Sequence, residues 1–170
     1  ASAGRVLVSV QVANNETGVI QPVADVAQAA KAQGAFVHTD AVQGAGRIPV
    51  DLRALGVDCL TLSAHKIGGP KGVGALVLHE RAQLPALIAG GGQERRRRAG
   101  TENVAAIAGF GAAAQAARRD LARMQEITVL RALLEREVQN ITPAAAVIGA
   151  DAERLPNTAS IALGGLQAET

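Results

Sequence analysis

Lys66 closes a short polar run, Ser63-Ala64-His65-Lys66, that follows an apolar stretch and precedes four closely spaced glycines. A lysine amine attacks carbonyl compounds once it has lost its proton, and burial or a nearby cation such as a protonated histidine favours that loss. A single lysine before a glycine loop is more often a solvated surface residue. Chemistry at Lys66 therefore depends on which other side chains the fold brings beside it.

Further polar residues follow the two preceding apolar stretches. Asn15 comes after the first, and Asp40 and Gln43 come after the second. In doubly wound α/β sheets, ligands bind outside the carboxyl ends of the strands, so we expect these side chains to gather with Ser63, His65 and Lys66 at one edge. A pyridoxal cofactor needs a lysine amine and an acidic partner for its ring nitrogen, and Lys66 and Asp40 fit these two roles.

The elements that would position these residues alternate along the chain. Short, β-branched apolar stretches predict strands at 6–12, 35–39, 57–62 and 75–78, and Pro22 and Gly34 bound a helix predicted over 23–33. Residues 51–56 predict one capped helical turn, with Asp51 as the cap. This alternation predicts an α/β fold with a mostly parallel sheet.

The second half of the chain has a different character. Residues 102–139 are rich in Ala, Leu, Arg and Glu, which predicts one long helix or two in tandem, and short strands are expected at 146–148 and 158–163. We therefore place a large domain at 1–121, and a connecting helix with the start of a small α+β domain at 122–170. The charges of the long helical region alternate in sign and predict a solvated face; they are Arg118, Arg119, Asp120, Arg123, Glu126, Arg131 and Glu135.

Composition limits the classes of protein that fit. The 170 residues are 48% hydrophobic and 19% charged, with 17 basic and 15 acidic side chains, which suits a folded domain and gives no overall attraction to nucleic acid. The arginine run 95–98 lacks the interleaved aromatics of a nucleic-acid site.

No apolar run reaches the roughly 20 residues of a membrane span, and no His or Cys spacing predicts a metal site. A single cysteine fits a reducing compartment, so we expect a cytoplasmic protein.

Six segments carry a resemblance to a known family. They read A-N-N-E-T-G at 13–18, H-T-D-A-V-Q at 38–43, S-A-H-K at 63–66, G-P-K-G at 69–72, G-G-G-Q-E at 90–94 and R-A-G-T-E-N at 98–103. In order and spacing they resemble the cysteine desulfurases of iron–sulfur cluster assembly. The resemblance implies a class-V aminotransferase on the fold-type I scaffold. It also implies pyridoxal 5'-phosphate as cofactor and conversion of L-cysteine to L-alanine and an enzyme-bound persulfide.

The resemblance also implies a role for each site residue. Lys66 would be the catalytic Schiff-base lysine and proton shuttle, and Asp40 would keep the pyridine nitrogen protonated. Asn15 and Gln43 would bind near the phenolic oxygen, and Ser63 and His65 would bind the phosphate. Thr101 would reach the phosphate of a partner subunit, which implies a homodimer. A sulfur-acceptor scaffold protein is the further partner implied.

Cys59 is not the expected persulfide cysteine, because it lies in an apolar strand where a thiol behaves as a small buried hydrophobe. The chain begins without Met and stops at Gln167-Ala168-Glu169-Thr170, so we expect an internal piece of a longer protein whose persulfide cysteine lies beyond it. His38 is interpreted as a satisfied core histidine, with a direct cofactor role as the alternative.

Two alternatives remain open for the whole protein. One is another class-V enzyme, such as a selenocysteine lyase or an aminotransferase, which would share Lys66 and Asp40. The other is a phosphate-binding α/β module that uses the glycine loop at 68–74. That loop, however, lacks both the Gly-x-Gly-x-x-Gly pattern and the Walker spacing.

Overall fold

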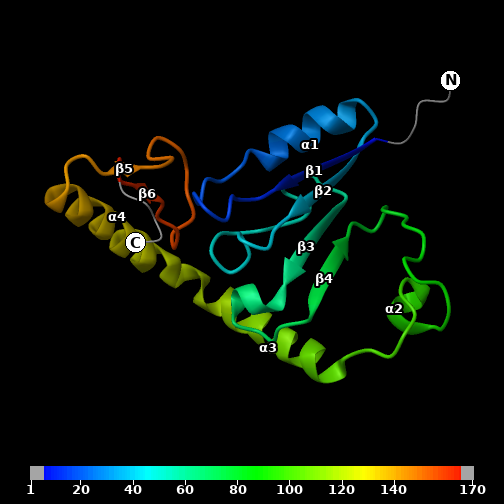
Figure 1. Ribbon diagram of the computed structural model, residues 1–170. Helices are drawn as coiled ribbons and strands as arrows, with labels where there is room; N and C mark the ends of the chain where they lie inside the picture. Colours follow the sequence, from blue (N-terminus) through cyan, green and yellow to red (C-terminus); the bar gives the residue numbers. More distant parts are fainter. Residues whose placement is uncertain (1–5, 166–170) are drawn as a thin grey trace.

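The computed structural model of the chain describes residues 6–165. A four-stranded sheet occupies its first half (Figure 1). Its strands lie side by side in chain order: β1 (Leu7–Gln11), β2 (Phe36–Asp40), β3 (Cys59–Ser63) and β4 (Gly74–Leu78). The first three strands are parallel and β4 is antiparallel to β3, which confirms the predicted, mostly parallel sheet.

The strand register brings the predicted site residues to one edge. Asp40, the last residue of β2, pairs with Gln11 of β1 and Thr61 of β3. Because parallel strands run in the same direction, the segments that follow β1, β2 and β3 all leave from the same edge of the sheet. The segment after β3 is the single turn η1 (Ala64–Ile67), which carries His65 and Lys66.

Helix α1 (Val23–Ala32) covers one side of the sheet (Figure 1). Its buried residues Val23 and Ala27 join Val37 of β2 and Leu60 of β3 in an aliphatic core. Burial of each aliphatic side chain in this core contributes about 1.5–3 kcal/mol.

The predicted long helical region is two helices in tandem. These are α3 (Val104–Asp120) and α4 (Met124–Ile141), joined by the 3₁₀ turn η2 (Leu121–Arg123). α3 packs against the segment that carries Lys66, and two glycines permit the close approach. A Cβ on Gly109 would lie 2.7 Å from Pro70 Cγ, and one on Gly69 would lie 3.2 Å from Ala113 Cβ.

The end of the described chain forms a small two-stranded antiparallel sheet, β5 (Ala146–Val147) and β6 (Ile161–Ala162), with both strands shorter than predicted. The segment between them packs on the loop that follows β1. Leu155 N donates to Gly18 O at 2.8 Å, and Ile20 N donates to Glu153 O at 2.9 Å. The terminal residues 1–4 and 167–170, on which the expectation of an internal piece rested, lie outside the described residues.

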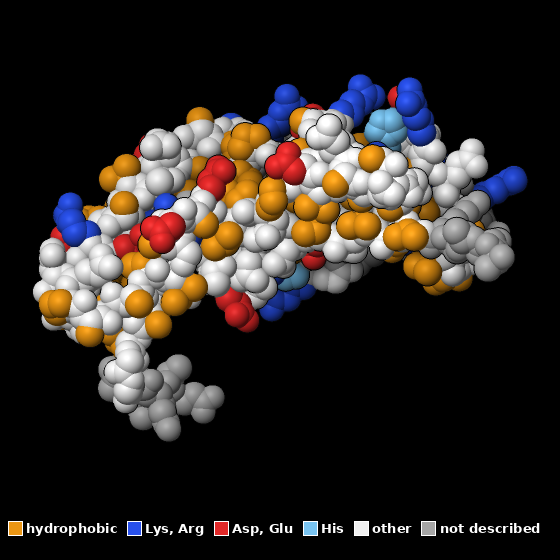
Figure 2. Space-filling view, turned by 90° about the horizontal axis from the view of Figure 1, so that it is seen from above, with side chains coloured by type: hydrophobic (Ala, Val, Ile, Leu, Met, Phe, Trp, Pro, Cys, Tyr) orange, Lys and Arg blue, Asp and Glu red, His pale blue; other side chains and the backbone are white. Residues whose placement is uncertain are grey.

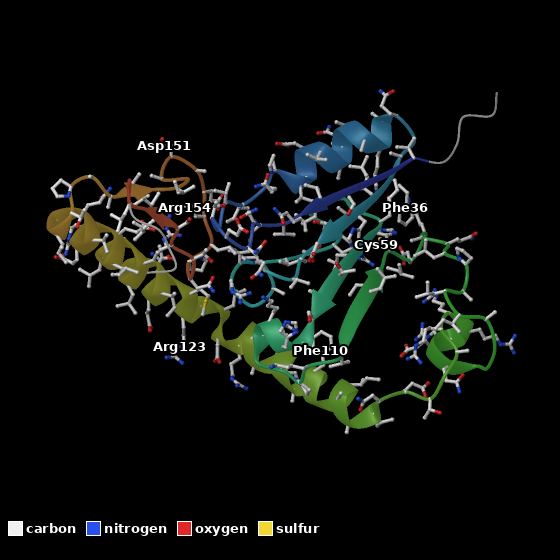
Figure 3. All side chains as sticks on the ribbon, in the orientation of Figure 1. Phe36, Cys59, Phe110, Arg123, Asp151 and Arg154 are labelled. Carbon is white, nitrogen blue, oxygen red and sulfur yellow. The ribbon has the colours of Figure 1, made fainter. Side chains whose placement is uncertain are left out.

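The prediction of a solvated charged face was wrong for Arg131 and Glu135. The side chains of Arg131, Glu135 and Arg154 are only 15%, 12% and 6% exposed. Figure 3 places Arg154 beside α4, where it binds Glu135 through both guanidinium amines. Arg131 donates to the backbone carbonyls of Arg154 and Leu155. The charges face inward because a segment remote in sequence supplies their partners.

The glycine-rich stretch around residue 93 contains an unpredicted turn, α2 (Gln93–Arg96). Glu94, Arg95 and Arg96 all have positive φ, at 46°, 56° and 64°, a left-handed conformation that costs an L-residue about 1–2 kcal/mol. A salt bridge of 3.3 Å from Arg98 to Glu94 closes the turn.

Large apolar side chains are exposed on several elements, including Leu7 of β1 and Leu76 of β4, the two edge strands. Figure 2 shows apolar side chains spread over the face seen from above, with basic and acidic side chains scattered among them. Both strands leave one row of backbone groups unpaired within residues 6–165, so the sheet has two open edges in this part of the chain.

Candidate functional site

Lys66 lies on η1, immediately beyond the carboxyl end of β3, and its side chain is exposed. Gly68 ends this turn with φ at 83°, a conformation open to glycine, and Gly69 N donates to Ala64 O at 2.8 Å. Two backbone features therefore hold the lysine at the sheet edge while its amine stays accessible.

Ser63 and His65 lie together beside Lys66. Ser63 Oγ and His65 Nδ1 are 2.8 Å apart, so the hydroxyl and the imidazole form one polar pair at the end of β3. The pair presents a hydroxyl and a second ring nitrogen to an incoming ligand, a combination suited to phosphate oxygens.

Asp40 ends β2, next to β3, and is exposed. Its Oδ1 accepts a hydrogen bond from Val42 N at 2.9 Å, which fixes the carboxylate against the turn that carries Gln43. Ala41 N donates to Thr61 O at 3.0 Å and ties this turn to β3. The structure thus brings Asp40 and Gln43 to the same edge as Ser63, His65 and Lys66.

Asn15 lies at the tip of a hairpin turn that follows β1, and it is exposed. The neighbouring Asn14 holds the turn, because its Oδ1 accepts from Glu16 N and Thr17 N, both at 2.9 Å. Gly18 N also donates to Asn14 O at 2.9 Å. Asn15 lies on the segment that leaves the sheet at the edge where the other site residues lie. Within residues 6–165 its side-chain amide makes no hydrogen bond.

Thr101 is exposed and lies three residues before α3, in the segment that joins α2 to α3. No hydrogen bond among residues 6–165 links it to the other site residues.

Arg47 is a residue of this region that sequence reasoning missed. Its Nη1 donates to Gln43 O at 2.9 Å and its Nη2 donates to Lys66 O at 3.1 Å, so one side chain bridges the two site segments. Partial burial lowers the pKa of the Arg47 guanidinium. The only sequence signal was an arginine next to a glycine, four residues after Gln43, which does not distinguish it from a surface arginine.

His38 has a partner for each ring nitrogen. Nδ1 lies 2.7 Å from Ser9 Oγ on β1, and Nε2 lies 3.2 Å from Thr61 Oγ1 on β3. Both ring nitrogens bond within the sheet, which favours the interpretation of His38 as a satisfied histidine.

Cys59 is buried at the start of β3, as the sequence predicted, and burial raises the pKa of its thiol. Four residues separate it from Ser63 at the other end of the strand, about 13 Å at 3.3 Å per residue. Figure 3 shows Cys59 at the end of β3 away from η1. A protonated thiol at that distance cannot act on a ligand at Lys66.

Two cavities lie beside the sheet. One, of about 620 Å³, is lined mainly by apolar residues of the sheet and α3, including Leu60, Leu62, Ile107 and Phe110. It is also lined by Gly46 and by Ile67 of η1, next to the site segments. Another, of about 720 Å³, lies at the opposite end of β3 and is lined by Arg53, His79 and Glu80 among others. We place the site at the strand ends, because neither cavity is lined by Asp40, Gln43, Ser63, His65 or Lys66.

Within residues 6–165, no helix is both long and apolar enough to cross a membrane. The same residues contain no group of three or more His, Cys, Asp or Glu side chains arranged to hold a metal ion.

Comparison with known proteins shows to which family the chain belongs. The class-V aminotransferase model matches residues 2–170. The chain belongs to the class-V aminotransferase family. Among its curated relatives, a cysteine desulfurase of Enterobacter agglomerans is 45% identical over 163 residues, which cover 96% of this chain and 41% of that protein. The cysteine desulfurase NifS of Azotobacter vinelandii is 44% identical over 164 residues, again 96% of this chain and 41% of the relative. This class-V chain thus spans about two fifths of the length of these relatives.

Solved structures of related proteins have a similar fold. The NifS-like protein from Rickettsia africae superposes with a TM-score of 0.91 at 41% sequence identity, covering 97% of this chain and 46% of that one. A more partial match, with a TM-score of 0.61 and 38% identity over 65% of this chain, is to SspA in complex with cysteine. The likeness to the Rickettsia protein confirms the predicted α/β class-V fold.

Proposed function

We propose that the protein containing this chain is a pyridoxal-phosphate-dependent cysteine desulfurase. We further propose that this chain supplies the part of the active site that contains Lys66. The observation that carries the proposal is the gathering of Lys66, Asp40 and the Ser63–His65 pair at the carboxyl ends of β2 and β3. The desulfurases among its relatives, at 44–45% identity, support the same reaction.

The donor set fits the cofactor. An exposed amine, a carboxylate one strand away and a hydroxyl–imidazole pair are the groups that an aldehyde, a pyridine nitrogen and a phosphate require. When bound, the cofactor supplies an electron sink that stabilises negative charge on the substrate carbon.

Each residue of the chain would then have one task. Lys66 would hold the cofactor through its amine and move a proton to and from the substrate carbon. Asp40, fixed by Val42 N, would hold a proton on the ring nitrogen, because a carboxylate favours the charged form of a neighbouring cation. Asn15 and Gln43 would donate amide hydrogen bonds near the phenolic oxygen, and Ser63 and His65 would bind the phosphate.

Further parts of the proposal concern assembly. Thr101 would contact the phosphate in the partner of a homodimer. A sulfur-acceptor scaffold protein would take the outer sulfur of a persulfide carried by a cysteine other than Cys59, leaving that cysteine as a thiolate. The division at 121/122 coincides with η2 between the two long helices, which supports separate large and small domains. We place the protein in the cytoplasm.

The experiment is an assay of the complete protein with pyridoxal phosphate, L-cysteine and a thiol reductant, with L-alanine and sulfide both quantified. We expect equal amounts of the two products, abolished by Lys66→Ala and retained by Lys31→Ala, whose side chain lies on α1 and pairs with Asp58. Alanine formed from L-selenocysteine but not from L-cysteine would contradict the proposal and favour a lyase. Equal turnover in the two variants would contradict the role of Lys66.

A further inference from the structure

Two site segments that are separate in sequence meet at one arginine. The turn after β2 contributes the carbonyl of Gln43, and η1 contributes the carbonyl of Lys66. The guanidinium of Arg47 donates one amine to each, at 2.9 and 3.1 Å. Within residues 6–165 these are the hydrogen bonds that join the two segments through a side chain.

The backbone around Arg47 places its side chain close to η1. Gly46 has a φ of +72°, and a Cβ there would lie 3.0 Å from Ala117 Cβ of α3 and 3.4 Å from Ile67 Cγ2 of η1. A glycine therefore allows the turn to sit directly on η1 and α3. Arg47 N and Ile48 N both donate to Gly44 O at 3.0 Å, which fixes the direction in which the arginine side chain leaves.

The chemistry of the contact favours a structural link. A guanidinium is a rigid, planar donor that stays charged, so its bonds to neutral carbonyls are charge-assisted and stronger than bonds between neutral groups. Partial burial strengthens the bond to Gln43 O, because water competes less for that donor. A lysine at this position could reach one carbonyl with a compact ammonium but could not span two in a fixed plane.

We propose that Arg47 is a positioning residue that fixes the backbone of Lys66 relative to the Asp40–Gln43 turn. The inference rests on the proposed function of Lys66, but the link itself needs no bound cofactor. Arg47 touches no reacting group. It sets the distance between the segment with the amine and the segment with the carboxylate and the amide.

The test compares three variants of the complete protein. Arg47→Met removes both donors while keeping much of the side-chain volume, Arg47→Lys keeps one donor and the charge, and Arg53→Met is the matched control. Arg53 lies in the neighbouring turn, is exposed, and its guanidinium donates no hydrogen bond among residues 6–165.

The first readout is hydrogen–deuterium exchange of the cofactor-free protein, which is independent of activity. In Arg47→Met we expect the amides of Ile48 and Gly69, which are bonded to Gly44 O and Ala64 O, to exchange at least about tenfold faster. The amide of Val12, bonded to Asp40 O within the sheet, should be unchanged. Arg47→Lys should fall between the wild type and Arg47→Met, and Arg53→Met should match the wild type.

The second readout is the division between kcat and KM for L-cysteine. Misplacement of a reacting group lowers the rate more than it weakens binding, so Arg47→Met should lose about 10- to 100-fold in kcat with KM changed less than about threefold. Arg47→Lys should recover most of kcat. Equal exchange and equal kcat in Arg47→Met and Arg53→Met would overturn the inference.

The two hypotheses fail in different ways. Faster exchange in Arg47→Met, in a protein whose wild type makes no alanine from cysteine, would support the link and contradict the proposed function. Wild-type exchange together with normal desulfurase activity in Arg47→Met would contradict the link alone. If Arg47→Met does not fold, exchange in Arg47→Lys decides: wild-type rates at Ile48 and Gly69 would overturn the proposal, and intermediate rates would support it.

Discussion

Arg154 binds both carboxylate oxygens of Glu135, with Nη1 at 2.7 Å from Oε1 and Nη2 at 2.9 Å from Oε2. The pair joins α4 to the segment 153–155, which in turn pairs with the loop after β1 through Gly18. A bidentate pair with little exposure is geometrically specific, and removing one partner leaves a charge without compensation. The pair therefore connects the end of the described chain to the loop that carries Asn15.

Glu135→Gln should destabilise the complete protein by about 2 kcal/mol, because the amide keeps the shape but not the charge that Arg154 and Arg131 require. Urea unfolding followed by circular dichroism measures this loss. The matched control is Glu137→Gln on the exposed side of α4, which should leave the unfolding free energy nearly unchanged. Equal losses of unfolding free energy in both variants would show that the buried pair stabilises the protein no more than an exposed pair does.

The same pair predicts a pH dependence. The hydrogen bond from Arg154 lowers the pKa of Glu135 below its ordinary value of 4.5, so the folded state binds this proton less tightly than the unfolded state. The stabilisation is therefore complete above about pH 5 and is lost as the pH falls through the lowered native pKa. The stability difference between wild type and Glu135→Gln should shrink across that acidic range. A difference that stays constant down to pH 3 would contradict the assignment.

The sequence predicted the sheet well because its strands are short and apolar, and Gly34, Gly56 and Gly74 directly precede three of the predicted strands, which are local signals. It also placed the polar residues at the strand ends, since Asp40 and Ser63 are the last residues of β2 and β3. Arg47 and Arg131 could not be predicted, because each bonds backbone carbonyls that are distant in sequence: Lys66 O for Arg47, and Arg154 O and Leu155 O for Arg131. The alternating charges of α4 were predicted to be solvent-exposed, because their partner Arg154 is also remote in sequence.

Cys59→Ala should cost at most about 1–2 kcal/mol, the effect of a small cavity in an aliphatic strand environment, and should keep desulfurase activity. In the native protein the thiol should react slowly with iodoacetamide at neutral pH, because its raised pKa keeps it protonated and the sheet covers it. Mass spectrometry before and after unfolding in urea follows the reaction. Rapid native labelling, or an inactive but folded Cys59→Ala protein, would mean that Cys59 takes part in sulfur transfer.

Gly18→Ala should destabilise the protein more than Gly34→Ala, although the two glycines have nearly the same φ, +74° and +76°. At Gly34 the added methyl meets nothing within 4 Å, so the cost is the left-handed backbone alone, about 1 kcal/mol. At Gly18 the methyl would lie 2.7 Å from Thr158 Cβ, which must move away from the loop. Thermal melts of both variants isolate the packing contribution, and similar Tm values would refute the contact.

Asp40→Ala should still bind pyridoxal phosphate at high concentration but lose most turnover, because the ring nitrogen would no longer be held protonated. Cofactor binding is measured by the visible absorbance retained after desalting, and turnover by alanine formation. Asp151→Ala, which removes an exposed carboxylate in the loop between β5 and β6, is the control and should behave as wild type. Near-normal turnover by Asp40→Ala would show that another residue faces the nitrogen.

The most direct test of the proposed site is to reduce the complete protein with borohydride in the presence of pyridoxal phosphate and to map the modified peptide by mass spectrometry. We expect one stoichiometric label, on Lys66, absent in Lys66→Ala and unaffected in Lys31→Ala. A label on Lys71 or Lys31 instead, or no label on a protein that retains the cofactor, would contradict it.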